Sequence, residues 1–534
     1  MNVEEFRRAA YTAIDLICDY QESLEQLPVV AQVEPGYLGK LLPKEAPTKG
    51  EPFDDIARDY QQYIMPGMTH WQHPSFFGYF PVANTFESVL ADLLSGSITN
   101  PGFNWACSPA CTELETIVMD WAAKLFGLDP RFYIESGVGG GVLLTTASDS
   151  ALTAVVAARS RYTRAHPDVP LDQLIIYGTS QTHSLGAKAA LILGLQFRAI
   201  EVYPEDNYAL RGRILVKALE NDRKAGKHPF VIIGTIGTTS SGAIDNIQEI
   251  GQALSDYSDI WLHIDAAWAG VALACPEFRE MAQLEGINNY AHSFCTNFHK
   301  WGLVNFDCST LWVRERTLLT DSLDVTPEYL RTKHADSGTV IDYRNWHLAL
   351  GRRFRSLKVW FVLRSFGIEG FQTHIRKGVE LAKYFESLVK QSSLFEIVTP
   401  RSFGLVVFRL ILPSALPTPV VGTPSNGHGT ISQETDLTTG ASPDTTTTSQ
   451  IRLAMPSTQS KQSMAHSKAN LINRAFYARV SAQKSILLTQ TDLAGTFCIR
   501  MAIGATRTEE KHVHDAFDLL VEEAQATLKK WKPE

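Results

Sequence analysis

Short apolar segments alternate with helical patterns between residues 137 and 315, and this alternation limits the fold more than any other feature of the chain. Apolar strands separated by amphipathic helices indicate a largely parallel sheet covered by helices, which is an α/β fold. Side chains that carry chemistry are then expected at the carboxyl ends of the strands. Strands are predicted at residues 174–178, 230–235, 260–265 and 309–313, and helices at residues 150–161, 184–193, 214–225 and 246–255.

Patterning and composition divide the 534 residues into three parts. We expect an N-terminal helical segment over residues 1–85, a large α/β domain over 86–380 and a small α+β domain over 381–534. Within the last part, residues 413–467 are rich in Pro, Ser, Thr, Gly and Gln. Too few large apolar side chains occur there to offset the entropy of ordering, so this segment is predicted to be a disordered insertion.

Bulk properties exclude several classes of partner. The formal net charge is −8 and no run of Lys or Arg occurs, which argues against a nucleic-acid partner. No run of about 18 apolar residues is present, so no membrane span is expected. The seven cysteines lack the paired spacing of a metal site, and their odd number is typical of free thiols in a reducing compartment. We therefore expect a cytoplasmic protein without a metal.

Lys300 and Asp265 form the most informative pair of polar residues. Asp265 ends the predicted strand 260–265, and Lys300 follows the largely apolar residues 293–295. Apolar surroundings lower the pKa of a lysine and favour the free amine, which can form a Schiff base with an aldehyde cofactor. A carboxylate at a strand end can hold a pyridinium nitrogen protonated. A solvated lysine and a helix N-cap are the ordinary alternatives for each residue alone, but the pair predicts pyridoxal 5'-phosphate (PLP).

A phosphate site is predicted where small hydroxyl residues open a helix. The glycine-rich residues 137–141 precede Thr146, Ala147 and Ser148, and no Gly-Lys-Ser/Thr follows, so this is not a P-loop. Free backbone N–H groups and the helix dipole can hold a phosphate there, which is compatible with ordinary N-capping. His183 follows the predicted strand 174–178 and could either stack on a planar cofactor or serve a structural purpose.

A series of motifs in a fixed order carries a family resemblance over nearly the whole chain except residues 413–467. On these motifs the chain resembles the group II PLP-dependent decarboxylases, and most closely the aromatic-L-amino-acid decarboxylases. The motifs are VEPGYL (33–38), HPSFFGYFP (73–81), SPACTELE (108–115), HIDAAWAG (263–270), NFHKWGLVNFDCS (297–309), DSGTVIDYRNW (336–346) and GRRFRSLKVWFVLR (351–364).

The resemblance implies a PLP-dependent enzyme of fold type I that forms a homodimer with active sites at the subunit interface. Lys300 resembles the Schiff-base lysine, Asp265 the partner of the pyridinium nitrogen and His183 the residue that stacks on the ring. The cofactor-binding residues implied are Thr146, Ala147, Ser148, His183, Thr239, Asp265, Ala267, Asn297, His299 and Lys300. The substrate-binding residues implied are Trp71, Tyr79, Phe80, Pro81, Val82, Phe103, His299 and Gly351, with Phe103 reaching across the interface.

Tyr329 matches the mobile-loop tyrosine of the family, which protonates the substrate Cα after carbon dioxide leaves. Relatives with phenylalanine at this position tend to be oxidative aldehyde synthases, so Tyr329 favours simple decarboxylation to the amine. An aldehyde synthase and an inactive scaffold remain as alternative functions. Without the flanking match, Tyr329 would be interpreted as an exposed loop aromatic.

The expected substrate is an aromatic amino acid, because the segment 71–80 is rich in aromatic residues. Gly351 leaves more room than serine, and Val82 replaces a threonine that is common in relatives, so we expect tryptophan and 5-hydroxytryptophan ahead of tyrosine, DOPA and phenylalanine. Phe298, Trp268 and Asp149 also depart from the usual family residues, which bears on specificity rather than on the cofactor.

Overall fold

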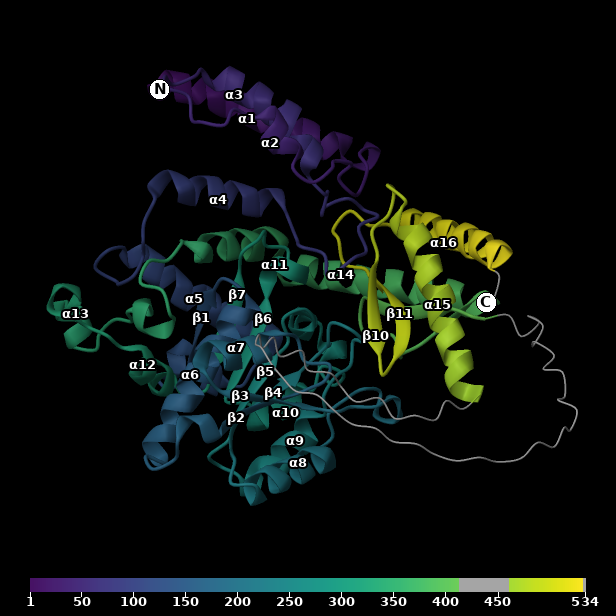
Figure 1. Ribbon diagram of the computed structural model, residues 1–534. Coiled ribbons are helices and arrows are strands. Elements are labelled where there is room, and N and C mark those ends of the chain that lie inside the picture. Colours follow the sequence, from purple (N-terminus) through teal and green to yellow (C-terminus); the bar gives the residue numbers. More distant parts are fainter. Residues whose placement is uncertain (413–460, 532–534) are drawn as a thin grey trace, which may run out of the picture.

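The computed structural model describes residues 1–412 and 461–531 (Figure 1). Its large domain is built on a seven-stranded sheet with the order β1-β7-β6-β5-β4-β2-β3. The pairs β2–β3, β2–β4, β4–β5 and β5–β6 are parallel, and β7 is antiparallel to both β1 and β6. This mostly parallel sheet confirms the predicted α/β fold. The strands are β1 (Gly140–Leu144), β2 (Leu174–Thr179), β3 (Gln196–Ile200), β4 (His228–Thr235), β5 (Trp261–Asp265), β6 (Ser293–Asn297) and β7 (Ser309–Val313).

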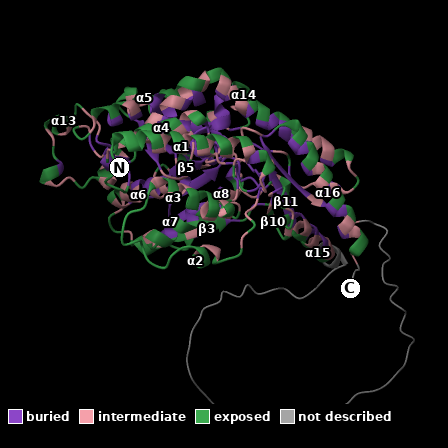
Figure 2. Cartoon of the chain, turned by 90° about the horizontal axis from the view of Figure 1, so that it is seen from above, coloured by how far each residue is buried: buried purple, intermediate pink, exposed green. Residues whose placement is uncertain are grey.

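The two faces of the sheet bury two separate apolar clusters, because side chains alternate along each strand. On β2, Ile175 and Tyr177 belong to one cluster, whereas Leu174 and Ile176 belong to the other. Figure 2 shows buried residues in the interior around β5 and exposed residues on the outer helices. The helices of this domain are α5 (Pro109–Phe126), α6 (Ala147–Ala165), α7 (Leu185–Leu193), α8 (Gly212–Lys224), α9 (Ile247–Ala253), α10 (Leu284–Tyr290), α11 (Phe298–Trp301), α12 (Arg316–Leu323) and α13 (Lys333–Asp336).

The N-terminal helices form an arm that lies outside the large domain in Figure 1. They are α1 (Val3–Ser23), α2 (Tyr37–Leu41) and α3 (Phe53–Asp59). Helix α4 (Phe86–Ile98) lies between this arm and the large domain in Figure 1, and the hydroxyl of its N-cap residue Thr85 donates to the Leu303 carbonyl at 2.9 Å. Asn2 begins α1 with a capping box that includes Glu5. The arm is tied to the C-terminal part by a hydrogen bond of 2.7 Å from the Val29 amide to the Lys484 carbonyl. Helix α4 keeps five large apolar side chains exposed, namely Phe86, Leu90, Leu93, Leu94 and Ile98.

The C-terminal domain packs helices against the four-stranded antiparallel sheet β10-β11-β9-β8. Helix α14 (Arg355–Gln391) is broken at Gly367, whose φ of 63° is not helical, and it then continues past residue 380, the predicted domain boundary. The remaining elements are β8 (Phe395–Ile397), β9 (Leu405–Leu410), α15 (Lys461–Ser481), β10 (Thr489–Leu493), β11 (Thr496–Ala502) and α16 (Glu510–Lys530).

The predicted insertion at 413–467 falls mostly outside the described residues. Its last part is an exception, because helix α15 already begins at Lys461. The predicted end at residue 467 is therefore too late, and the reason is local: residues 461–469 are rich in Lys, Gln, Met and Ala, which favour helix. In the described part of the chain, none of the helices combines the length and the apolar character needed to cross a bilayer.

Candidate active site

A cavity of about 200 Å³ opens at the carboxyl ends of β4, β5 and β6. The parallel register places Thr235 beside Asp265, and Asp265 beside Cys295, so the ends of these strands meet at one edge of the sheet. This is the edge at which an α/β sheet holds its ligand. The cavity is lined by Phe80, Thr146, Ala147, Ser148, His183, Leu185, Thr235, Gly237, Thr239, Asp265, Ala267, Trp268, Asn297, His299 and Lys300.

Lys300 enters the cavity from α11, the short helix that follows β6 directly. Burial lowers the pKa of its amine, Asp265 and Cys295 oppose this effect, and Arg500 adds to the lowering. Its Nζ lies 5.5 Å from the centroid of the Phe80 ring. A lysine with a lowered pKa holds a larger share of free amine, which is the nucleophilic form.

Asp265 ends β5 and is 3% exposed. Its Oδ1 accepts a hydrogen bond of 3.0 Å from the Ala267 amide and a long contact of 3.9 Å from the Cys295 thiol. Behind it, burial lowers the pKa of His263 to about 4, so this ring is neutral at neutral pH. The Asp265 side chain therefore has a fixed orientation in the cavity wall, beside a neutral histidine.

Two histidines in the cavity wall are neutral. His183 follows β2, and its Nδ1 accepts a hydrogen bond of 3.2 Å from the Leu185 amide, which leaves Nε2 to carry the proton. Burial lowers the pKa of His183, against the attraction of Asp265. His299 accepts from the Cys308 amide through Nδ1 at 2.8 Å, and burial lowers its pKa to about 3. Flat, uncharged rings of this kind can lie against a planar ligand.

The N-terminus of α6 supplies the part of the cavity that fits an anion. Thr146 caps this 19-residue helix, and Ala147 and Ser148 form its first turn, where backbone N–H groups lack partners within the helix. Two buried oxygens near the strand ends, Thr235 Oγ1 and Asn297 Oδ1, make no hydrogen bond among the described residues. Since buried polar atoms are normally paired, these two indicate a polar ligand in the cavity.

The cavity residues fit PLP on these observations. An aldehyde carbon can meet the Lys300 amine, a ring nitrogen can meet Asp265, and a phosphate can meet the first turn of α6. When bound, the cofactor supplies an electron-withdrawing ring that accepts the electron pair released when a bond at the substrate Cα breaks. Every cofactor-binding residue that the sequence predicts lines this one cavity.

Four further residues line the cavity that the sequence analysis assigned neither to the cofactor nor to the substrate, namely Leu185, Thr235, Gly237 and Trp268. Thr235 could have been found, because it ends the predicted strand 230–235. Gly237 has a φ of 78°, and a Cβ there would lie 2.8 Å from the Ala269 Cβ, so the chain needs glycine at this close approach. Trp268 was identified only as a departure from the family pattern.

Aromatic rings close one wall of the cavity. The Phe80 and Trp268 rings stack with centroids 4.2 Å apart, and Trp268 stacks in turn on Trp301 at 5.6 Å. Behind this wall, the buried Arg500 guanidinium lies 5.0 Å from the Phe80 centroid. Lys300 and Arg500 therefore both contact the Phe80 ring.

Most of the predicted substrate-binding residues lie outside the lining of this cavity. Trp71 and Tyr79 stack with centroids 5.4 Å apart at the surface, and the Gln72 amide donates to the Val82 carbonyl. Pro81, like Phe80 before it, is buried. Phe80 is the residue of this segment that lines the cavity, so the role of the others in substrate binding stays a prediction.

Phe103, Tyr329 and Gly351 form a second set, which we call the Tyr329 group, and none of them lines the Lys300 cavity. Tyr329 lies in the turn η11 (Glu328–Leu330) and is 80% exposed. The Arg344 amide donates to the Phe103 carbonyl at 3.1 Å. Gly351 lies near Pro101, whose Cβ would be 4.0 Å from a Cβ at this glycine. Tyr329 and Gly351 are exposed, and Phe103 is half-buried.

Comparison with known proteins places the chain among relatives of similar length. The pyridoxal-dependent decarboxylase conserved domain matches residues 35–411. The chain is 39% identical to tryptophan decarboxylase 2 of Oryza sativa subsp. japonica, over 99% of this chain and 96% of the relative. It is 39% identical to tyrosine decarboxylase 2 of Narcissus pseudonarcissus over 99% and 95%. It is 48% identical to the aromatic-L-amino-acid decarboxylase of Rattus norvegicus over 77% and 86%.

Solved structures agree with the sequence matches. The structure of the Oryza sativa enzyme TDC with PLP and tryptamine superimposes with a TM-score of 0.86 at 34% identity, over 98% of this chain and 99% of the other. That of 4-hydroxyphenylacetaldehyde synthase from Rhodiola rosea gives 0.83 at 33% identity, over 98% and 99%. The resemblance drawn from the motifs is thus confirmed, and the chain belongs to the pyridoxal-dependent decarboxylase family, with PLP as its cofactor.

Proposed function

We propose that this enzyme converts aromatic L-amino acids to the arylalkylamine and carbon dioxide, with tryptophan and 5-hydroxytryptophan as preferred substrates. The observation that carries the proposal is the arrangement of the Lys300 amine, the Asp265 carboxylate and the neutral His183 ring around one cavity with an aromatic wall. Decarboxylation of aromatic amino acids is common to relatives that otherwise differ in substrate.

The aromatic wall supports an aromatic side chain in the substrate. The Phe80 and Trp268 stack offers an apolar surface beside Lys300, and among the described residues no arginine lines the cavity to attract an acidic side chain. A Cβ at Gly351 would meet only Pro101 within 4.0 Å, so the glycine leaves open space. Gly351 does not line the cavity of its own subunit. In the homodimer proposed below it would border the neighbour's cavity, where the missing side chain favours a two-ring substrate such as tryptophan over tyrosine by about 1–3 kcal/mol.

Tyr329 supports amine formation rather than oxidation to an aldehyde. A phenol can hold a proton for the substrate Cα once the carboxylate has left, whereas phenylalanine cannot. The 80% exposure of Tyr329 means that this side chain must meet the cavity of another copy, or must move to reach its own.

A homodimer would bring the two sets of residues together. Tyr329 and Gly351 are exposed, and so is the apolar face of α4 with Leu90, Leu93 and Leu94, as expected for surfaces that a second subunit covers. We propose that one subunit supplies Lys300 and its neighbour supplies Tyr329. The seven cysteines are all free, which supports the further proposal of a cytoplasmic location.

A substrate competition tests the function. Purified enzyme with added PLP would receive tryptophan, 5-hydroxytryptophan, tyrosine, DOPA, phenylalanine and histidine together, with amines and aldehydes measured by mass spectrometry and peroxide measured in parallel. Tryptamine without peroxide is expected. Tyramine or dopamine as the main product would overturn the tryptophan preference, aldehyde with peroxide would overturn amine formation, and the absence of any product would favour an inactive scaffold.

Subunit mixing tests the shared site. Lys300→Ala and Tyr329→Phe subunits would each form little amine alone, but a mixed dimer contains one site with both Lys300 and Tyr329. Amine formation should therefore return on mixing under conditions of subunit exchange, while light scattering reports the dimer. If mixing restores nothing although mixed dimers form, the two residues act within one subunit.

A further inference from the structure

The turn that carries Tyr329 is held from both sides by one buried side chain. Arg344 donates from Nη1 to the Leu330 carbonyl at 2.9 Å and from Nη2 to Thr326 Oγ1 at 3.2 Å. Tyr329 lies between these two points of attachment. Because a guanidinium is planar and rigid, two donors of one arginine fix both ends of the turn in a single geometry.

A buried carboxylate orients this arginine. Asp342 Oδ2 lies 3.3 Å from Arg344 Nη1, and the side chains are 6% and 4% exposed respectively. Asp342 Oδ1 accepts a hydrogen bond of 3.0 Å from the Trp105 amide, and the Arg344 amide donates to the Phe103 carbonyl at 3.1 Å. The pair thus connects the Tyr329 turn to the segment that carries Phe103.

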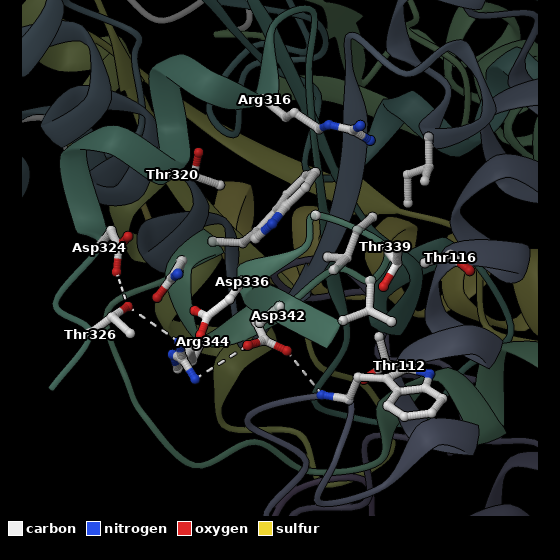
Figure 3. A pocket seen from close by; sticks show the side chains of 18 of the residues that line it. Thr112, Thr116, Arg316, Thr320, Asp324, Thr326, Asp336, Thr339, Asp342 and Arg344 are labelled. Carbon is white, nitrogen blue, oxygen red and sulfur yellow. Dashed lines mark hydrogen bonds and ion pairs between the residues drawn. The ribbon is translucent and has the colours of Figure 1, made fainter. Parts of the chain in front are cut away.

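Figure 3 shows this arrangement in the wall of a cleft of about 670 Å³. Arg344 lies between Thr326 on one side and Asp342 on the other, with dashed lines to both. Helix α12 and the segment after α13 border the same cleft, with Thr320 and Thr339 among the labelled residues. The Tyr329 turn therefore runs along an open cleft, and its attachments to Arg344 lie in the cleft wall.

Because the Asp342–Arg344 pair is buried, we interpret it as fixing the geometry of the turn rather than as stabilising the fold. Buried ion pairs contribute little net stability, because desolvation of the charges offsets their attraction, but they can specify one arrangement over its alternatives. The same turn region has a contrasting pair, Arg331 and Asp336, whose side chains are 52% and 47% exposed at 3.4 Å. An exposed pair of this kind fixes little, so Arg331 is a matched control.

We propose that Arg344 is a positioning residue that holds the ends of the Tyr329 turn so that Tyr329 is presented to the cavity of the neighbouring subunit, and that the Asp342–Arg344 pair thereby favours protonation of the substrate Cα over its reaction with dioxygen. The proposal rests on the role of Tyr329 in the proposed function. A residue outside the Lys300 cavity thus controls whether the amine or the aldehyde forms.

The expected chemistry of a displaced Tyr329 follows from electron balance. After the bond between Cα and the carboxyl carbon breaks, its electron pair either takes up a proton at Cα or reduces dioxygen. The second course consumes one amino acid, one dioxygen and one water, and it releases one aldehyde, one carbon dioxide, one ammonia and one hydrogen peroxide. Peroxide formed per amino acid consumed therefore measures how often protonation fails.

Four variants test the proposal, namely Arg344→Gln, Arg344→Lys, Arg331→Gln and Tyr329→Phe. In Arg344→Gln we expect amine kcat to fall about ten- to a hundredfold, as for a displaced reacting group, with peroxide per turnover rising toward that of Tyr329→Phe. KM and the near-visible absorption of lysine-bound cofactor should change little. Arg344→Lys keeps the positive charge but loses the planar guanidinium with its two donors, so it should recover part of the amine rate. Arg331→Gln should match the wild type.

The outcomes separate the inference from the proposed function. Peroxide from Tyr329→Phe but not from Arg344→Gln, with an amine rate within about twofold of wild type, would overturn the positioning role alone. If Tyr329→Phe makes no peroxide, the role of Tyr329 fails and the inference fails with it. Should Arg344→Gln lose the bound cofactor, Asp342→Asn decides: peroxide with intact absorption supports the proposal, and unchanged products or a second loss of cofactor refute it.

Discussion

The Lys300 cavity and the Tyr329 group differ in how they are held in place. The cavity residues follow strands of a buried sheet, so Asp265 and Asn297 are almost fully buried and their backbones are fixed by pairing on both sides. Tyr329 lies in a turn between two short helices, is 80% exposed, and is held through Arg344. The Lys300 cavity is thus part of the buried core, whereas Tyr329 lies on a turn at the surface.

This contrast matches the demands of the two steps. Cofactor binding needs several groups in one fixed geometry, and a sheet edge provides that. Protonation of Cα needs a group that can approach after the substrate has bound, and such groups are drawn from regions of low local stability. Variants in the Lys300 cavity should therefore abolish decarboxylation, whereas variants around Tyr329 should change which product forms.

The largest effect is expected from Lys300→Ala. Removing the amine eliminates the nucleophile, so decarboxylation should fall by about three orders of magnitude or more, and the near-visible absorption of bound PLP should disappear. Absorption spectra and amine assays on the same preparation check this. Retained absorption, together with cofactor that borohydride fixes covalently to the chain, would place the reactive lysine elsewhere.

Tyr329→Phe should leave the cavity intact and redirect its product. Loss of a proton donor costs about 10²–10⁴-fold in amine formation. The near-visible absorption should remain, and peroxide should appear with the aldehyde. Amine formation at the wild-type rate would show that another group protonates Cα. The structural difference between the buried cavity and the exposed Tyr329 turn would then have no bearing on which product forms.

Acid should destabilise the folded chain through the buried His263 of the central sheet. Unfolded His263 takes up a proton near pH 6.5, but burial lowers its pKa to about 4 in the folded chain. The unfolded state thus binds more protons in this window, so the free energy of unfolding is retained above pH 6.5 and falls by about 3 kcal/mol as the pH decreases to 4.

Urea unfolding at several pH values checks the acid effect with matched variants. His263→Gln should make the dependence between pH 6.5 and 4 less steep by the share of one histidine, while His299, whose pKa is lowered to about 3, keeps its own share; His334→Gln, which replaces an exposed histidine of α13, should leave it unchanged. Equal slopes for wild type and His263→Gln would show that other groups dominate acid unfolding.

The smallest effect is expected from Cys295→Ala. The thiol contacts Asp265 Oδ1 at 3.9 Å, which is a long and weak interaction. Its loss should raise the dissociation constant of PLP only about two- to threefold, since a net hydrogen bond contributes at most about 1 kcal/mol. Fluorescence titration of the apoenzyme measures this. A change of a hundredfold would mean that the thiol, and not the sheet, orients the carboxylate.

The sequence predicts the Lys300 cavity well, because local patterns determine the strands that carry its residues. All four predicted strands coincide with β2, β4, β5 and β7 to within two residues, and Lys300 and Asp265 follow from their positions at strand ends. Strand β6 was not predicted as a strand, since Ser293–Asn297 mixes polar and apolar residues and lacks a β-branched run. Its pairing between β5 and β7 overrides that weak propensity.

The Tyr329 group could be predicted only from the family resemblance. Nothing in the local pattern around Tyr329 shows that Arg344 contacts Leu330 and Thr326, because these contacts join segments 14 and 18 residues apart through a loop. Likewise, Phe103 and Gly351 carry no periodic signal. Side-chain contacts between irregular segments depend on the finished fold, and a sequence pattern records only the regular elements.

The contact of Arg500 with Phe80 has a consequence for the order in which the enzyme matures. Arg500 is on β11 and is synthesised 200 residues after Lys300, yet its charge helps to keep the Lys300 amine unprotonated across the Phe80 ring. A chain that ends before β11 lacks this cation beside Phe80, so its Lys300 amine would be more basic. Lys300 therefore reaches its lowered pKa in full only once β11 is in place against the Phe80 ring.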